Sequence, residues 1–236
     1  MNKKIQYELL LLVLSAIVIF NLCIIFTSHE PVEESFYNIT EIGSNENGTV
    51  YKVLAGNMSS NDTVGIIIGV HSREHEIHEA INNTIYNITH ENGDQNLTKK
   101  YAIYYVKTNS NLTSREDTRP AGENLANKFI VDNIVKDNPF IVVDVHEINP
   151  DYEYSNFIFS LSKNSTKINE YLKKISGDVN LVEYEFNEGT SPEKVTKPIA
   201  KKGINTFLME TSITDSPSQK QKTAENLIKS LDELQP

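Results

Sequence analysis

Side chains that can bind a metal ion or move a proton follow three apolar runs that lie far apart in the chain. They are His71 and Glu74 after residues 64–70, His146 after residues 140–145, and Glu210 after residues 204–209. Two imidazoles and two carboxylates make up a catalytic zinc site with an open fourth position and a nearby general base. The pattern therefore indicates hydrolytic chemistry at a zinc ion.

The apolar runs explain how these side chains would meet. Short apolar runs that alternate with helical patterns are typical of buried parallel strands. In open α/β sheets, ligand sites form just beyond the carboxyl ends of such strands. His71 and Glu74 are three residues apart where a helix begins, so one turn lets both face the same point. All four side chains are expected at one edge of one sheet.

The rest of the chain supplies the remaining elements of an α/β fold. Strands are predicted at residues 50–55, 64–70, 101–107, 140–145, 157–161, 181–186 and 204–209. Helices are predicted at residues 74–90, 123–136, 165–175, 193–201 and 218–234, with a polar loop at 108–120. The expected architecture is a three-layer sandwich with a mixed, mostly parallel sheet.

Length and composition limit the function classes. The 236 residues suit one good-sized domain. A net charge of −10 argues against a nucleic-acid-binding protein, which would carry a basic patch. The single cysteine, Cys23, lies in the N-terminal apolar segment. The globular part therefore has no disulfide, no thiolate nucleophile and no cysteine metal ligand.

The N-terminus predicts a membrane anchor. Residues 9–26 are almost entirely apolar and follow Lys3 and Lys4. This length is at the short end for a membrane span, and exceeds the roughly 7–15 residues of a signal-peptide core. The lysines place residues 1–8 in the cytoplasm, and the chain after residue 26 outside the cell. The alternatives are a cleaved signal peptide and a buried core helix.

The expected organisation is therefore a cytoplasmic N-terminus (1–8), a transmembrane signal anchor (9–26), a polar stalk (27–48) and a metallohydrolase domain (49–236). Export is supported by nine Asn-x-Ser/Thr sequons, where chance would give roughly four. They begin at Asn38, Asn47, Asn57, Asn61, Asn82, Asn87, Asn96, Asn111 and Asn164. An extracellular glycoprotein is expected, and the alternative is an Asn-rich chain without glycans.

The first motif resembles a known family. Gly69-Val70-His71-Ser72-Arg73-Glu74 is similar to the His-Ala-Arg-Glu motif of zinc carboxypeptidases of the carboxypeptidase A type. It is also similar to their compact relatives, the succinylglutamate desuccinylases and aspartoacylases. The resemblance implies that His71, Glu74 and His146 bind one zinc ion per chain. It also implies that Glu210, at the end of a late apolar strand, is the catalytic glutamate.

A second motif resembles the family only in part. Thr118-Arg119 is similar to a Thr-Arg pair whose arginine polarises the scissile carbonyl, which makes Arg119 a catalytic candidate. The family's Asn-Arg pair, which grips the substrate's terminal carboxylate, falls on Ala126-Asn127. Arg115 and Arg73 are the candidates to replace it. The alternative interpretation is that Arg115 and Arg119 are simply charged residues of a loop.

The remaining site assignments are secondary. Tyr184 lies upstream of Glu210, where the family often carries a mobile substrate-binding tyrosine. Asp144 and Glu147 flank His146 and would either orient an imidazole or form a salt link at the sheet edge. His75 and His78 are read as solvated surface residues beside the site, and residues 189–191 as a turn.

The preferred hypothesis is a membrane-anchored, extracellular zinc metallopeptidase that resembles a carboxypeptidase. Its expected partners are a peptide or amide substrate, with a cell-wall peptide as one candidate, and the membrane, but no nucleic acid. One alternative is a zinc amidohydrolase or deacylase that acts on N-acyl amino acids. The other is a catalytically inactive surface module that binds peptide or cell-wall material, which the missing Asn-Arg pair motivates.

Overall fold

The computed structural model describes residues 36–90, 97–186 and 188–236. The predicted cytoplasmic N-terminus, the predicted anchor at 9–26 and the first part of the predicted stalk lie outside the described residues. Within the described ranges, no helix combines the length and apolarity that crossing a membrane requires.

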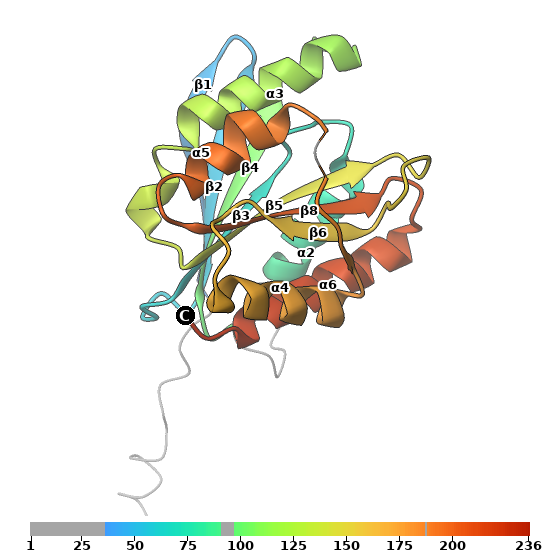
Figure 1. Cartoon of the computed structure of the whole chain (residues 1–236). Coiled ribbons are helices and arrows are strands. Elements are labelled where there is room, and N and C mark those ends of the chain that lie inside the picture. Colours follow the sequence, from blue (N-terminus) through green and yellow to red (C-terminus); the bar gives the residue numbers. More distant parts are fainter. Residues whose placement is uncertain (1–35, 91–96, 187) are drawn as a thin grey trace, which may run out of the picture. The chain divides into compact units, whose positions relative to one another are not determined.

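One mixed sheet of eight strands forms the centre of the fold (Figure 1). The strands are β1 (Phe36–Asn45), β2 (Gly48–Gly56), β3 (Thr63–Ile68), β4 (Lys100–Thr108), β5 (Ile141–Ile148), β6 (Phe157–Ser160), β7 (Val182–Glu183) and β8 (Asn205–Ser212). Their order is β1-β2-β4-β3-β5-β8-β6-β7. The four central strands, β4-β3-β5-β8, are parallel, whereas β1, β2 and β6 pair antiparallel with their inner neighbours. The predicted mixed sheet is confirmed.

Helices cover both faces of this sheet (Figure 1). They are α2 (His75–His90), α3 (Arg115–Phe129), the 3₁₀ turn η1 (Ile134–Asp137), α4 (Thr166–Val179), the π-helix η2 (Pro192–Thr196), α5 (Lys197–Ala200) and α6 (Pro217–Glu233). The side chains of α2, α4 and α6 pack on one face, and those of α3, η2 and α5 on the other. The predicted three-layer sandwich is confirmed for the described residues.

Strand β3 shows why the apolar runs lack an alternating pattern. Ile66 and Ile68 pack in the core beneath α2, while Ile67 packs in the core beneath α3. Both faces are buried, so every position favours an apolar side chain. Each buried isoleucine contributes about 1.5–3 kcal/mol. This packing fixes the strand that leads into His71.

Three predicted boundaries are corrected. Residues 36–45 of the predicted stalk form β1, which pairs antiparallel with β2 from Phe36 to Asn45 apart from a register shift between Glu41 and Gly43. The predicted loop 108–120 ends early, because α3 begins at Arg115, with the Ser114 side chain accepting a hydrogen bond from the Asp117 amide. Pro120, the last residue of the predicted loop, lies inside this helix. The predicted strand 181–186 is reduced to the two residues of β7.

Candidate metal centre

The carboxyl ends of β3, β5 and β8 bring the predicted residues together. His146 and Glu210 are direct neighbours in the parallel register of β5 and β8. His71 lies in the turn that follows β3, and its carbonyl accepts a hydrogen bond from the Glu74 amide at 3.0 Å. Gly69 turns the chain there with φ +79°, and a Cβ at this residue would lie 2.2 Å from the Val106 carbonyl oxygen. The turn therefore depends on glycine.

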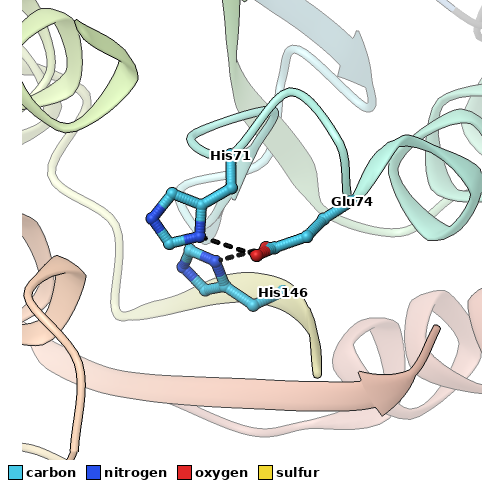
Figure 2. Close-up of side chains that lie close together, drawn as sticks. All are labelled: His71, Glu74 and His146. Carbon is cyan, nitrogen blue, oxygen red and sulfur yellow. Dashed lines mark hydrogen bonds and ion pairs between the residues drawn. The ribbon is translucent and has the colours of Figure 1, made fainter. Parts of the chain in front are cut away.

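Two imidazoles converge on one carboxylate (Figure 2). His71 Nδ1 lies 2.8 Å from Glu74 Oε1, and His146 Nδ1 lies 2.9 Å from Glu74 Oε2. The three side chains are buried, and their candidate ligand atoms all lie within 4.8 Å of one another. Imidazole and carboxylate are ligands that zinc accepts, and three protein ligands leave one position open. The donor set therefore fits a catalytic zinc ion.

The other nitrogen of each ring faces a second carboxylate. His71 Nε2 lies 3.2 Å from Glu123 Oε1, and His146 Nε2 lies 3.0 Å from Asp144 Oδ1. Metal-binding histidines commonly donate their second ring N–H to a carboxylate, which fixes the ring and its tautomer. Both histidines are thus oriented with Nδ1 toward Glu74, which is a second observation that fits a metal site.

Glu123 is a candidate site residue that the sequence prediction missed. It comes from α3, one helical turn after Arg119, and its carboxylate is almost completely buried. The i,i+4 spacing from Arg119 was the available signal, because it places both side chains on one face of a helix. The 52-residue separation from His71 gave no local signal.

One segment, residues 190–196, supports both outer carboxylates. The Thr190 hydroxyl donates to Glu123 Oε1, and Lys194 Nζ lies 3.1 Å from Glu123 Oε2. The Thr196 hydroxyl donates to Asp144 Oδ2 at 2.7 Å. This segment contains the π-helix η2, an irregularity that often occurs at functional sites.

The charges in the cluster favour an ionised ligand. Burial alone would raise the pKa of Glu74, but hydrogen bonds from His146 and His71 outweigh burial and hold that pKa below its usual range. Burial alone would lower the pKa of His146, but the Asp144 and Glu74 carboxylates outweigh it and raise that pKa well above its usual range. Glu74 is therefore an anion in the folded protein, as a metal ligand must be, whereas His146 would release its proton on binding a metal ion.

Glu210 has the properties of a general base. Its Oε2 is buried and finds no hydrogen-bond partner among the described residues. Burial is the main cause that raises the pKa of Glu210 to about 8. A general base works best when its pKa lies near the working pH. A bound cation would lower this pKa again, because it stabilises the neighbouring carboxylate.

A cavity of about 800 Å³ opens over the cluster, and Glu210 lines it. The chain contains only three arginines, Arg73, Arg115 and Arg119, and all three line this cavity. Arg119 is held 3.8 Å from Glu74 Oε1 and 3.6 Å from Glu123 Oε1. Apolar side chains also line it: Ile148, Pro150, Tyr152, Phe186 and Ile213. The cavity thus combines guanidinium groups with an apolar wall.

Two predicted positions lie away from the cavity. Tyr184 packs against the Tyr154 and Phe157 rings and is not among the described residues that line the cavity. Tyr152 and Phe186 are the aromatic residues of the wall, and the substrate-binding role of Tyr184 stays a prediction.

Ala126 and Asn127 also lie away from the cavity and make other contacts. Ala126 is buried in the core beneath α3, and Asn127 donates to the Lys194 carbonyl at 2.6 Å. Neither residue lines the cavity, so the arginines that do line it are the available cationic groups.

Three neighbouring residues resolve the alternatives left open by the sequence. Asp144 faces the His146 ring, as the orienting interpretation expects. Glu147 points elsewhere and pairs with Lys220 at 2.7 Å, which is the salt-link interpretation. The prediction of a solvated His78 is wrong: the ring is buried, accepts from the Gly69 amide at 3.1 Å and donates to the Val145 carbonyl at 2.8 Å.

No protein-family model matches the chain, and a comparison with curated proteins finds no match. Solved structures do match. A metallo-carboxypeptidase from Burkholderia cenocepacia superposes with a TM-score of 0.60 at 13% identity, covering 86% of this chain and 65% of that one. An aspartoacylase family protein from Mesorhizobium loti gives 0.51 at 9% identity, covering 85% and 62%. The succinylglutamate desuccinylase from Chromobacterium violaceum gives 0.50 at 11% identity, covering 79% and 71%.

These likenesses show a shared fold. The proteins they name are those that the His71–Glu74 motif resembles, so the resemblance is confirmed at the level of the fold. The chain spans about two thirds of the length of the metallo-carboxypeptidase.

Proposed function

We propose that this protein is a zinc-dependent hydrolase that cleaves a peptide or amide bond. One observation carries the proposal: the buried cluster of His71, Glu74 and His146 lies beside Glu210, at the floor of an arginine-lined cavity. A zinc ion held by the three ligands would supply Lewis acidity and lower the pKa of a water molecule from about 15.7 to about 7.

The protein's own residues account for the proton and charge movements. The Glu210 carboxylate, which lines the cavity, accepts the proton of the attacking water and passes it to the leaving amine. Arg119 donates to the substrate carbonyl oxygen as negative charge develops there. A donor of this kind contributes about 3–4 kcal/mol in measured cases. The ion pairs of Arg119 with Glu74 and Glu123 hold its guanidinium beside the ligands.

The finer proposal is a carboxypeptidase-like reaction. A terminal carboxylate is held best by a planar guanidinium, which pairs with it bidentately. Arg115 and Arg73 line the cavity, and Arg73 makes one hydrogen bond of 3.4 Å, to the Thr113 carbonyl. Both are suited to bind that carboxylate, which leaves Arg119 for the scissile carbonyl.

A deacylase is the second candidate, and the three arginines in one cavity support it, since they suit a small acidic N-acyl amino acid. Mass spectrometry of digests separates these reactions. Loss of a terminal residue identifies a carboxypeptidase, internal cuts identify an endopeptidase, and loss of an acyl group identifies a deacylase. If no peptide or N-acyl substrate is cleaved with zinc present, the inactive binding module replaces both.

We further propose a single-pass location in the cell membrane with the catalytic domain outside. The apolar segment 9–26 and the excess of sequons support it. In cells of a host with glycosylation machinery, we expect a glycosidase-sensitive mass and cleavage of the domain by protease added outside. Protection from that protease in intact cells would contradict the proposed orientation.

The metal assignment is tested with the full-length chain. We expect one zinc ion per wild-type chain by elemental analysis and none in His146→Ala, because two remaining ligands hold zinc poorly. Full zinc occupancy in His146→Ala would refute the ligand assignment.

A further inference from the structure

A buried lysine lies behind the candidate metal ligands. Lys220 belongs to the first turn of α6, and only 1% of its side chain is exposed. Its ammonium group forms an ion pair with Glu147 Oε1 at 2.7 Å, and donates to Glu76 Oε2 at 2.7 Å and to the Ile213 carbonyl at 3.1 Å. The buried ammonium group thus has three oxygen partners, two of which are carboxylates.

The three partners of Lys220 come from the elements that carry the site. Glu147 directly follows the ligand His146 on β5, and Glu76 lies two residues after the ligand Glu74 in the first turn of α2. Ile213 directly follows β8, the strand that carries Glu210. One ammonium group therefore ties together the three chain segments that hold the ligands and the candidate base.

Glu147 connects this lysine to the ligand Glu74. Its carboxylate accepts from the Ile77 amide at 3.2 Å, at the start of α2, and its backbone amide donates to Glu74 Oε2 at 3.3 Å. The Glu147 side chain is 1% exposed, so without Lys220 it would be a buried charge with no cation partner at this distance. Movement of Glu147 would shift both the start of α2 and the amide that holds Glu74.

We propose that Lys220 is a positioning residue for zinc binding: it fixes Glu147, and through it the Glu74 carboxylate and the first turn of α2. The inference rests on the proposed zinc site but goes beyond its ligands and base. Lys220 is not among the described residues that line the cavity, so it acts through the ligands and not on the substrate.

The chain offers a matched control. Lys99, just before β4, is also a buried lysine, with 4% of its surface exposed. Its ammonium group donates to the Asp232 carbonyl at the opposite edge of the sheet. Lys99→Met and Lys220→Met both remove a buried charge, but only the second disturbs an element that carries a ligand.

The experiment measures zinc affinity of the full-length chain by competition with a chelator, alongside thermal unfolding followed by circular dichroism. We expect Lys220→Met to weaken zinc affinity by about 10–100-fold, the usual effect of losing a residue that orients a ligand. Lys220→Arg should recover most of the affinity. Lys99→Met should lower the unfolding midpoint and leave zinc affinity unchanged. KM at saturating zinc should stay unchanged in Lys220→Met.

Wild-type zinc affinity in Lys220→Met would overturn the proposal, as would an equal loss of affinity in Lys99→Met. If Lys220→Met does not fold, Glu147→Gln breaks the same ion pair at nearly constant volume. It should weaken zinc affinity similarly, and wild-type affinity in Glu147→Gln would also overturn the proposal. A wild-type chain that binds no zinc would instead refute the proposed function, and with it any role of Lys220 in that function.

Discussion

The amino edge and the metal edge lie at opposite ends of the parallel strands, and both gather carboxylates, one partly exposed and the other largely buried. At the amino edge, which comprises Thr98, Lys99, Tyr101 and Asp232, the Asp232 carboxylate accepts from two backbone amides and two hydroxyls. At the metal edge, which comprises His71, Glu74, His146 and Glu210, the carboxylates of Glu74 and Glu210 lie beside the cavity. A buried lysine accompanies each edge: Lys99 belongs to the amino edge, and Lys220 lies behind the metal edge.

Unsatisfied atoms distinguish the edges. Among the described residues, the buried side-chain atoms without an aligned hydrogen bond are Asp144 Oδ1, Glu210 Oε2 and Ser230 Oγ. Two of them belong to Glu210 and to the carboxylate behind His146, and none belongs to the amino edge. Asp144 Oδ1 still lies 3.0 Å from His146 Nε2, so Glu210 Oε2 is the atom at the metal edge that a bound ligand would complete, since an unpaired buried polar atom costs free energy. The polar contacts at the amino edge are satisfied within the fold, whereas the unpaired Glu210 oxygen at the metal edge fits the proposed site.

The largest expected effect tests Glu210, the unsatisfied carboxylate itself. Glu210→Gln keeps the shape of the side chain but cannot accept a proton. We expect zinc to remain bound and kcat to fall by at least about 100-fold, the scale of general acid–base catalysis. Stopped-assay rates and elemental analysis check both parts. Undiminished turnover would remove Glu210 from the mechanism.

His78 sharpens the comparison, because it lies near the metal edge and yet is fully hydrogen-bonded, like the amino edge. Burial lowers the pKa of His78 from 6.5 to about 4. The unfolded chain therefore binds a proton first as the pH falls. Neutral His78 contributes fully to stability above pH 6.5, and this contribution disappears as the pH falls from about 6.5 to 4. The free energy of unfolding is expected to fall by about 3 kcal/mol over this range.

Urea unfolding at several pH values measures this effect. The wild-type chain should lose more stability than His78→Gln as the pH falls through that window, since glutamine does not titrate. Parallel pH dependences in the two proteins would show that His78 is not the group responsible.

Two single substitutions, one at each edge, test whether the edges differ in function. Glu123→Gln weakens the acceptor behind His71, so zinc affinity should fall by about 10–100-fold. Asp232→Asn removes the charge from the amino edge, so the unfolding midpoint should fall while zinc affinity stays the same. Chelator competition and calorimetry measure the two quantities. Loss of zinc affinity in Asp232→Asn would mean that the two edges are coupled.

The smallest effects separate the arginines. Arg115→Ala should raise KM for peptides with a free terminal carboxylate and spare amidated ones, because it removes ground-state binding. Arg119→Ala should mainly lower kcat, because its donor acts on the developing charge. Steady-state kinetics on matched free and amidated peptides distinguish the two patterns. Equal wild-type activity on both peptides would end the carboxypeptidase proposal and leave an amidase or endopeptidase.

The sequence predicted what depends on local pattern. Buried runs such as residues 140–145 locate β5 to within three residues, and each run ends at a side chain that lines or forms the site. Strand β1 was missed, because its polar, largely exposed residues resemble a stalk and its pairing with β2 stabilises it. The roles of Glu123, His78 and Lys220 depend on partners up to 144 residues away, which no local pattern encodes.

Close backbone packing at Gly69 has a further consequence for how the protein tolerates mutation. Gly122 in α3 makes a similar approach, since a Cβ there would lie 1.9 Å from the Val70 carbonyl oxygen. These two residues let the turn before His71 touch both β4 and the helix that carries Glu123. Neither has a functional group, yet in a survey of all single substitutions they should be as intolerant as the ligands. Selection for activity would therefore conserve these two glycines, which allow the close backbone contacts, as strictly as the residues that carry the chemistry.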